Sequence, residues 1–520
     1  MNTRKKDGDY DAIVVGSGIG GLCAAGMLAR YGKRVVVCES HSIAGGAAHA
    51  FVRDGFHFDS GPSFFCGLSD PTSLNPLRQV LDALGETVEA VPYDPFGHYH
   101  FPDRTVPIYG SADRYRAELA KATPEGARQF AGFEREMLRL YAGLKEIPAI
   151  ALRSDWQVLP ILISRYAMGL VKLLPSLGNV DSSVGRILDR HVPDPWVRRL
   201  IDLECFLLSG LKAHGTIAPE FAFMLGERDR SVIDYPVGGG AAIVAALVRG
   251  LEKWGGELRL RSHVEKIEVE NGRAVGVRLK SGKQIAASIV ISNATIWDTN
   301  EHLLDPQHLP AADRQQAERM SPIESFMHLH LGIRADGLEG LTGHHVVLHD
   351  ADRDLAEPGN TCMISIPTVW DSGLAPDGHH TIHVYSLEGF DRWESLDRRS
   401  EAYAQLKAER AAALYRAIER VIPDLRDRLV LELVGTPLTH SRFLRRHRGT
   451  YGPGIVAERD RFPSVRSALP GLYRVGDSTM PGIGVPAVAA SGLSCANSLV
   501  DRARVEEMLD RSPSKARSTT

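Results

Sequence analysis

The sequence predicts an α/β fold in which a Rossmann-like, dinucleotide-binding domain is interleaved with an α+β domain. Two observations predict it. An apolar strand at residues 12–15 leads into a glycine-rich turn at 16–21 (GSGIGG), and a short strand at 472–475 leads into Gly476-Asp477. A buried strand, a glycine turn and a helix in this order are typical of a dinucleotide site. We therefore expect the two ends of the chain to enclose one dinucleotide.

Size and composition set the class of protein. The 520 residues are enough for more than one domain. The hydrophobic share of 43% is ordinary for a soluble globular protein, and the net charge of −3 gives no general attraction to nucleic acid. The six cysteines form no C-x-x-C pair, which argues against a disulfide framework or a zinc site. No apolar stretch precedes the first strand, so we expect a cytoplasmic protein without a secretory signal.

The first glycine turn has the context that a nucleotide site needs. Gly16 permits the tight turn, Gly18 lets the backbone approach a pyrophosphate, and Gly21 lets the following helix pack on the strand. The helix directs its positive end at the pyrophosphate. Glu39 ends the next apolar strand (RVVVC), where its carboxylate suits ribose hydroxyls and repels a 2′-phosphate. NADP is therefore not expected here.

The segments that follow favour FAD over NAD. A second glycine pair lies within residues 40–49 (SHSIAGGAAH), and residues 59–63 read DSGPS. They suit a long cofactor whose flavin end continues across the domain. Asp477 would then serve the ribityl chain. Residues 482–492 (GIGVPAVAASG) would begin a helix whose N-terminus faces the flavin pyrimidine, where negative charge collects on reduction.

The rest of the chain alternates helices and strands. Thr123 and Pro124 mark the start of a helix whose apolar face is Phe130, Phe133, Met137, Leu140 and Leu144. Strand character returns near residue 257, with turns at Asn271-Gly272 and Ser281-Gly282, which predicts a three-stranded antiparallel meander inserted in the parallel sheet. A long helix is expected over 401–422, ended by Pro423.

These elements predict two domains, each assembled from separated segments. The dinucleotide-binding domain comprises residues 8–70, 232–297 and 465–508. The substrate domain comprises 71–231 and 298–464, and a polar, disordered tail follows at 509–520.

Gly238–Gly240 lacks the G-x-G-x-x-G pattern and opens a helix over 241–254, so no second nucleotide site is predicted. The electron donor or acceptor is not identified by the sequence.

The chain resembles the FAD-dependent phytoene desaturase, carotenoid isomerase and retinol saturase family, within the amine-oxidase-like flavoprotein fold. The resemblance covers nearly the whole sequence, and the middle motifs are most similar to the carotenoid isomerase branch. The motifs are VVGSGIGGLCAA (14–25), GGAAHAF (45–51), FDSGPS (58–63), YPVGGGAAIVAALVRGLEKWGG (235–256), RSHVEKI (261–267), GTPLTHSRFLRRHRGTYGP (435–453) and GLYRVGDSTMPGIGVPAVAASG (471–492).

The resemblance implies FAD and a set of contacts. The pyrophosphate would be held by Gly16, Ser17, Gly18, Gly20 and Gly21, and the ribose by Glu39 with Ser40 beside it. Gly46 and Ala47 would lie along the cofactor, and the Val264 backbone would contact the adenine. The flavin would lie near Gly61, Pro62 and Ser63 and would be enclosed on its other side by Gly476, Asp477, Gly484 and Val485. Many desaturases and amine oxidases have an arginine after the paired glycines. This chain has Ala47-Ala48-His49 instead, which favours the isomerase reading.

The resemblance therefore implies an FAD-dependent oxidoreductase or isomerase that acts on a long apolar polyene. Carotenoid cis-trans isomerisation by reduced flavin is favoured. The alternatives are a phytoene desaturase or retinol-saturase-type reductase, an amine-oxidase-like enzyme, and a non-enzymatic escort like the GDP-dissociation inhibitors. The catalytic residues are not identified.

Three further features bear on partners. Residues 147–180 are apolar but broken by charges and prolines, which predicts either a helical part of the substrate domain or a surface that dips into one membrane leaflet. The basic cluster Arg442, Arg445, Arg446, His447 and Arg448 could attract anionic headgroups, with a solvated loop as the favoured reading. His328 and His330 share a strand face, but no third ligand stands at a useful spacing, so no metal is expected.

Overall fold

A five-stranded parallel sheet forms the centre of one half of the molecule. The computed structural model describes residues 10–230 and 233–511; the predicted tail lies outside these ranges from residue 512 onward. The sheet has the order β19-β13-β1-β2-β9, and every neighbouring pair is parallel. Its strands are β1 (Ala12–Val15), β2 (Val35–Cys38), β9 (Glu257–Arg259), β13 (Ile289–Ser292) and β19 (Leu472–Arg474).

Both faces of this sheet are covered, as continuous apolar strands require. Ala12 and Val14 of β1 face a core that includes α1 (Ile19–Arg30), α2 (Pro76–Leu84), α10 (Gly240–Lys253) and α17 (Val485–Ser498). Ile13 and Val15 face the predicted antiparallel meander, formed by β10 (Val264–Glu270), β11 (Arg273–Leu279) and β12 (Gln284–Ala286). Leu258, at the expected start of strand character, lies in β9 and extends the parallel sheet.

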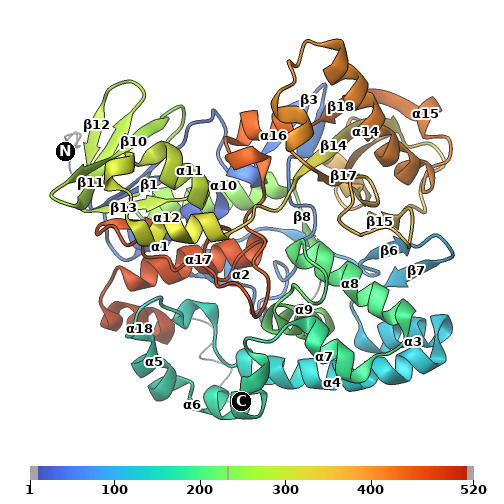
Figure 1. The fold of residues 1–520 in the computed structure, drawn as a ribbon, viewed down its shortest axis with the longest axis horizontal. Helices are drawn as coiled ribbons and strands as arrows, with labels where there is room; N and C mark the ends of the chain where they lie inside the picture. The colour runs from blue at the N-terminus through green and yellow to red at the C-terminus, as the bar shows by residue number, and fades with distance from the viewer. Residues whose placement is uncertain (1–9, 231–232, 512–520) are drawn as a thin grey trace.

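A seven-stranded sheet forms the second half, to the right in Figure 1. Its order is β18-β14-β17-β16-β15-β6-β7, and only the pair β15–β6 is parallel. The strands are β6 (Gly97–His100), β7 (Thr105–Ile108), β14 (Ser325–Arg334), β15 (His344–Leu348), β16 (Thr361–Ser365), β17 (His379–Glu388) and β18 (Leu429–Gly435). One face packs on α14 (Glu401–Glu419) through residues such as Met327 and Leu329. This helix ends at Glu419, three residues before the predicted end, and a turn leads on to Pro423, with the Ile422 N–H still donating to the Ile418 carbonyl oxygen at 2.7 Å.

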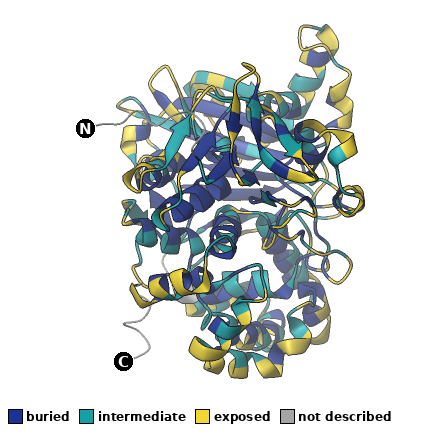
Figure 2. Cartoon of the chain, turned by 90° about the vertical axis from the view of Figure 1, so that its left-hand side faces the viewer, coloured by how far each residue is buried: buried dark blue, intermediate teal, exposed yellow. Residues whose placement is uncertain are grey.

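A layer of helices covers the lower part of the molecule in Figure 1. Its longest member, α4 (Pro124–Leu144), begins as predicted, with the Gly126 N–H donating to Thr123 Oγ1 at 3.2 Å. The others are α3 (Ala112–Ala122), α5 (Val158–Arg165), α6 (Ala167–Leu173), α7 (Val184–His191), α8 (Pro195–Ser209) and α9 (Ala218–Arg230). Figure 2 shows that exposed residues gather on the outer helices and loops, whereas the strands at the centre of the molecule are mostly buried.

The two large sheets divide the chain in an interleaved way. All strands of the parallel sheet come from residues 8–70, 232–297 and 465–508, and all strands of the seven-stranded sheet from 71–231 and 298–464. Short two-stranded sheets, β3 (Ala50–Arg53) with β4 (Phe56–Asp59) and β5 (Ala90–Pro92) with β8 (Asp234–Pro236), lie in the segments between. The chain crosses repeatedly between the halves, so the surface between them is built from distant segments.

Candidate functional site

The two ends of the chain meet at the glycine turn. A Cβ on Gly20 would lie 2.9 Å from the backbone nitrogen of Gly476, and one on Gly492 would lie 2.4 Å from the Gly20 carbonyl oxygen. Helices α1 and α17 therefore touch through backbone, as their adjacent ribbons in Figure 1 illustrate. A Cβ on Gly21 would lie 2.5 Å from the Gly16 carbonyl oxygen. Gly21 thus allows the close packing of helix on strand that its position predicted.

Two adjoining cavities open at this junction, with volumes of about 670 and 210 Å³. Both are lined by Gly18, Ala47, Asn293 and Arg446, so they form one bent cleft. The predicted residues that line the larger cavity are Gly16, Ser17, Gly18, Glu39, Ser40, Gly46, Ala47 and Val264. Those that line the smaller cavity are Gly18, Gly20, Ala47, Gly61, Pro62, Gly476, Asp477, Gly484 and Val485. Tertiary structure therefore brings residues from every predicted cofactor segment to one cleft.

Two of the residues predicted to contact the cofactor do not line either cavity. Gly21 lies behind the turn, against the Gly16 carbonyl group. Ser63 lines neither of the two cavities, and its Oγ lies 3.0 Å from the Tyr385 hydroxyl oxygen. Both residues therefore support cleft-lining residues instead of facing the cleft.

Glu39 is held at the end of β2 by hydrogen bonds to both carboxylate oxygens. Oε2 accepts from the Ser17 N–H at 2.8 Å and from the Ser17 hydroxyl at 2.7 Å, and Oε1 accepts from the His41 N–H at 2.7 Å. These hydrogen bonds fix the carboxylate group beside the larger cavity, which it lines. It has the chemistry to accept from ribose hydroxyls and to repel a phosphate.

The smaller cavity receives the N-terminus of α17. Gly484 caps this helix with φ +98° and offers no side chain to the first backbone N–H groups. Gly484, Val485 and Val488 all line the cavity. The unsatisfied N–H groups and the helix dipole make this end of the cavity favourable for negative charge.

An aromatic wall closes the smaller cavity on the side of the seven-stranded sheet. Phe326, His328, Tyr385 and Tyr451 line it. Tyr451 stands edge-on to Phe326, with ring centres 4.8 Å apart, and its hydroxyl donates to the Ser60 carbonyl oxygen at 3.4 Å. Burial raises the pKa of Tyr385 to about 12, so its phenol stays protonated at neutral pH. The wall is thus largely apolar and uncharged, with its hydroxyls bonded to protein.

Sequence reasoning missed Asn293, which occupies the centre of the cleft. Asn293 follows β13, and its side chain lies 2.5 Å from a Cβ placed on Gly18 and 2.9 Å from one placed on Gly476. The signal was available, because ligands bind beyond the carboxyl ends of parallel strands and β13 pairs with β1 there.

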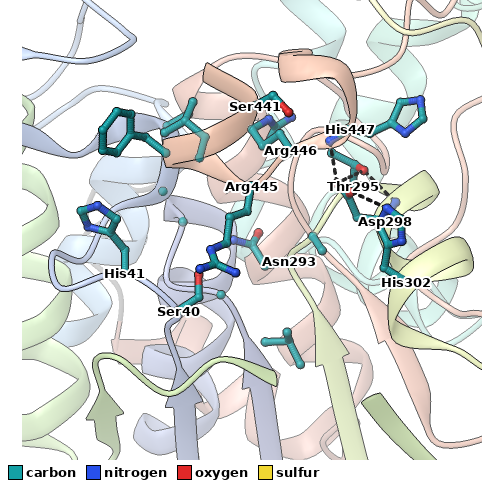
Figure 3. Close-up of a pocket in the computed structure, with 18 of the residues that line it drawn as sticks. Ser40, His41, Asn293, Thr295, Asp298, His302, Ser441, Arg445, Arg446 and His447 are labelled. Atoms are coloured by element: carbon teal, nitrogen blue, oxygen red, sulfur yellow. Dashed lines mark hydrogen bonds and ion pairs between the residues drawn. The ribbon is translucent and has the colours of Figure 1, made fainter. Parts of the chain in front are cut away.

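The basic cluster faces this cleft, which corrects the reading of a solvated loop. Arg445, Arg446, His447 and Arg448 line the larger cavity, and Arg442 does not. In Figure 3 the Arg445 side chain extends toward Ser40, while the His447 N–H donates to Asp298 at 2.8 Å. Arg446, His447 and Arg448 are partly buried, whereas Arg442 and Arg445 are exposed. The cluster therefore borders the cleft with positive charge and also meets solvent at two of its arginines.

The cleft fits the shape and charge of FAD. It is long and bent, begins at a helix N-terminus beside Glu39, and ends at a second helix N-terminus beside Asp477. Gly18 and Gly20 leave no space for side chains at its narrowest point. Such a cradle matches an adenine ribose at one end, a pyrophosphate in the middle and a ring system at the other.

Comparisons with known proteins give one consistent result. The sequence model of the family described as flavin containing amine oxidoreductase matches residues 19–500. A chloroplastic prolycopene isomerase of Arabidopsis thaliana is 37% identical over 503 residues, which cover 95% of this chain and 83% of that protein. A neurosporene-forming phytoene desaturase of Rhodobacter capsulatus is 27% identical over 541 residues, covering 97% and 96%. The structure of an oxidoreductase from Methanosarcina mazei matches with a TM-score of 0.62 at 20% identity, over 93% of this chain and 99% of that one.

Proposed function

Because the chain belongs to the family of flavin containing amine oxidoreductases, we propose that it uses reduced FAD to isomerise cis double bonds of a carotenoid to trans. The observation that carries this proposal is the match to a prolycopene isomerase along almost the entire chain. The family membership and both glycine units favour an enzyme over a GDP-dissociation-inhibitor-like escort.

The chemistry needs little from protein side chains. Rotation about a conjugated double bond is blocked until its bond order falls, and bound reduced flavin would supply the electron density that lowers it, with no net redox change. The protein must then bind the polyene, keep water out and hold the chain flat against the ring system.

The described residues of the smaller cavity suit these tasks. Phe326, Tyr385 and Tyr451 offer ring faces and edges to a hydrocarbon chain. The hydroxyls of the two tyrosines bond to Ser63 and to the Ser60 carbonyl group, so they are not presented to the substrate. Ile483 and Val488 add apolar surface on the opposite side. A polar amine finds fewer partners on this wall than a polyene does.

One experiment separates the related reactions. The purified protein is incubated without oxygen with poly-cis and all-trans carotenes, with the flavin either reduced or oxidised, and the products are separated and weighed by mass spectrometry. We expect isomerisation that requires reduced flavin and leaves the mass unchanged. A product lighter by two hydrogens would assign a desaturase, as the similarity to phytoene desaturase allows. One heavier by two would assign a saturase, and hydrogen peroxide released with amines an amine oxidase.

We further propose that the enzyme takes its substrate from a membrane surface. Within residues 10–230 and 233–511, no single helix has the length and apolar character to cross a bilayer; α5 with residues 167–179 passes that test only as a pair bent by 92°. This bent pair and the turn before it nevertheless expose large apolar side chains, with exposed fractions from 55% at Leu177 in the pair to 74% at Trp156 in the turn. The set is Trp156, Leu159, Ile163, Met168, Val171, Leu174 and Leu177.

So many exposed large apolar side chains within one short segment are unusual on a water-exposed surface and suit shallow insertion into a lipid interface. Arg165 and Lys172 of this segment form ion pairs with Asp510 and Glu146, so the proposal depends on the apolar side chains. Sedimentation with liposomes tests the proposal. We expect the wild-type protein to sediment and the triple variant Trp156→Ser, Ile163→Ser, Met168→Ser to stay in solution with its flavin content unchanged. Equal recovery of both in the supernatant would contradict it.

A further inference from the structure

Four buried histidines gather beside the smaller cavity, between the seven-stranded sheet and helix α16 (Pro437–Leu444). His328 and His330 lie two residues apart on β14 and share one face. His383 lies directly opposite His330 on β17, and His440 belongs to α16. Nitrogens of His328, His330 and His383 all lie within 4.8 Å of one another. None of the four residues is more than 7% exposed.

The backbone explains why these rings converge. His328 pairs with Gly435, the last residue of β18. Helix α16 begins just beyond the end of β18 and places the His440 Nε2 against the His328 Nε2. The sequence shows only the spacing of His328 and His330; strand pairing adds His383, and the helix adds His440.

Hydrogen bonds among the rings leave nitrogens unsatisfied. His328 Nδ1 lies 2.6 Å from His383 Nε2, and His328 Nε2 contacts His440 Nε2. Each neutral imidazole has one N–H and one lone pair, so a row of three rings satisfies its two contacts and leaves one nitrogen at each end. Those nitrogens are Nδ1 of His383 and Nδ1 of His440, which have no partner among the described residues. A bound water at each end would complete the row. The case for an ion therefore depends on the converging nitrogens of His328, His330 and His383, and not on these two end atoms.

A backbone carbonyl group fixes the orientation of one ring. His330 Nε2 lies 3.1 Å from the Asp59 carbonyl oxygen, so Nε2 carries the hydrogen and Nδ1 keeps its lone pair. A histidine ligand that donates its second N–H to a backbone carbonyl group is the usual arrangement in metal sites.

We propose that His328 Nδ1, His330 Nδ1 and His383 Nε2 bind a divalent transition-metal ion in the wall of the smaller cavity. Zn²⁺ is the ion that three imidazoles with an open fourth position suit best. His440 would accept the second N–H of His328 and fix its orientation, instead of acting as a ligand. Two nitrogens at about 2.0–2.1 Å from a tetrahedral ion are about 3.3 Å apart, so His328 and His383 must separate from their 2.6 Å contact. The three ring planes lie within 10° of one another, and His330 stacks on His383 with ring centres 4.4 Å apart, so His330 must also turn to aim its lone pair at the ion.

This proposal revises the expectation of no metal, which depended on the absence of a third ligand near His328 and His330 in sequence. It is independent of the proposed isomerisation, because its test measures metal and not turnover. His328 lines the cavity beneath the aromatic wall, so an ion there would lie next to the polyene or flavin position.

Metal analysis of the flavin-loaded protein tests the site. Untagged protein is produced in zinc-supplemented medium, purified without chelators and analysed by plasma mass spectrometry. We expect about one equivalent of metal per chain, since a preformed buried site retains its ion. The variants His328→Gln and His383→Gln should lose it. The matched control is His344→Gln, because His344 is also buried in this sheet and has a lowered pKa, but it lies outside the cluster.

A second measurement covers the case in which the glutamine variants do not fold. Treatment of the wild-type protein with a chelator should lower its Tm. Added Zn²⁺ or Co²⁺ should restore the original Tm, and Mg²⁺ should not. The proposal would be overturned if the wild-type protein held less than about a tenth of an equivalent of metal and if its Tm did not change when Zn²⁺ and Co²⁺ were added. The cluster would then be a row of hydrogen-bonded imidazoles. Metal that persists equally in all variants would also overturn it.

Discussion

Arg446 and Asp477 form an ion pair across the junction of the two cavities, with Nη2 at 2.5 Å from Oδ2. The two residues come from separate domains of the predicted division, and the side chains are only 14% and 15% exposed. Arg446 lines both cavities, whereas Asp477 lines the smaller one. The pair therefore places a positive charge at the point where an FAD molecule would pass from its pyrophosphate to its ribityl chain.

Arg446→Ala should weaken FAD binding. The variant leaves the Asp477 carboxylate without its cation and removes a charged donor from the cofactor path, which we expect to raise the Kd for FAD about tenfold, or ~1.4 kcal/mol. Quenching of flavin fluorescence on titration into cofactor-free protein measures it. Arg442→Ala is the control, because Arg442 belongs to the same basic segment but is exposed and lines neither cavity. Equal FAD affinity for both variants would argue against this role of Arg446.

Gly20→Ala should disrupt the contact between the chain ends. The added methyl group would lie 2.9 Å from the Gly476 nitrogen and 3.1 Å from Asn293 Oδ1, so backbone must move. Overpacking of this kind lowers the free energy of unfolding by about 1–3 kcal/mol, and here it also narrows the cofactor path. Thermal unfolding and the ratio of flavin to protein absorbance report the two effects. Gly178→Ala has nothing within 4 Å of its new Cβ and should leave both unchanged.

Asp313→Asn should destabilise the C-terminal part of the parallel sheet. Asp313 Oδ1 accepts from Arg474 Nη2 at 2.8 Å, and both side chains are buried, with exposed fractions of 5% and 2%. Loss of one partner leaves an uncompensated buried charge, which costs about 3–5 kcal/mol of unfolding free energy. Chemical denaturation followed by circular dichroism measures it. Glu357→Gln, which removes an exposed ion pair with Arg353, should cause no measurable change, and an equally small effect of Asp313→Asn would show that the buried pair is unimportant.

Glu220→Gln should change how stability depends on pH. Burial raises the pKa of Glu220 from 4.5 to about 8, in a small cavity that it shares with the apolar residues Ile455 and Phe462. Between these two pH values the folded protein keeps a proton that the unfolded chain releases, so the free energy of unfolding falls as pH rises through this window. In Glu220→Gln the free energy of unfolding should not decrease in this way, because glutamine does not titrate.

We therefore expect Glu220→Gln to match the wild type near pH 5 and to exceed its stability by about 1–3 kcal/mol near pH 8. Unfolding curves across this pH range provide the measurement. Glu252→Gln, at an exposed position on α10, is the control and should follow the wild-type profile. If Glu220→Gln also follows it, the carboxyl group is not protonated in the folded protein near neutral pH.

Local sequence was sufficient to predict the outline of the fold and the identity of the cofactor as FAD. The predicted class, an amine-oxidase-like flavoprotein fold, and the predicted family are confirmed by the family match and the solved structure. The glycine turn could be recognised because a tight turn, a buried strand and a following helix each restrict the residues at fixed spacings. The start of α4 was predicted for the same reason, since capping by Thr123 depends only on its nearest neighbours.

Other parts of the site could not be predicted in this way. Asn293 carries no local signal beyond its place after a buried strand, and its position among the glycines of the two turns depends on how β13 pairs with β1. Arg446 was read as part of a solvated cluster because a run of arginines has the same composition on a surface and in a cleft. Whether the smaller cavity accepts a polyene depends on an aromatic wall contributed by three separate strands or loops.

The sequence by itself predicted a dinucleotide site formed by both ends of the chain, because glycine spacing and strand character act over a few residues. Only the tertiary structure decided which side chains meet across the cleft. The four histidines are the clearest case: two are neighbours on β14, but strand pairing and a helix start bring His383 and His440 to them from residues far along the chain. Long-range contacts of this kind follow from the packing of whole elements, which no short segment encodes.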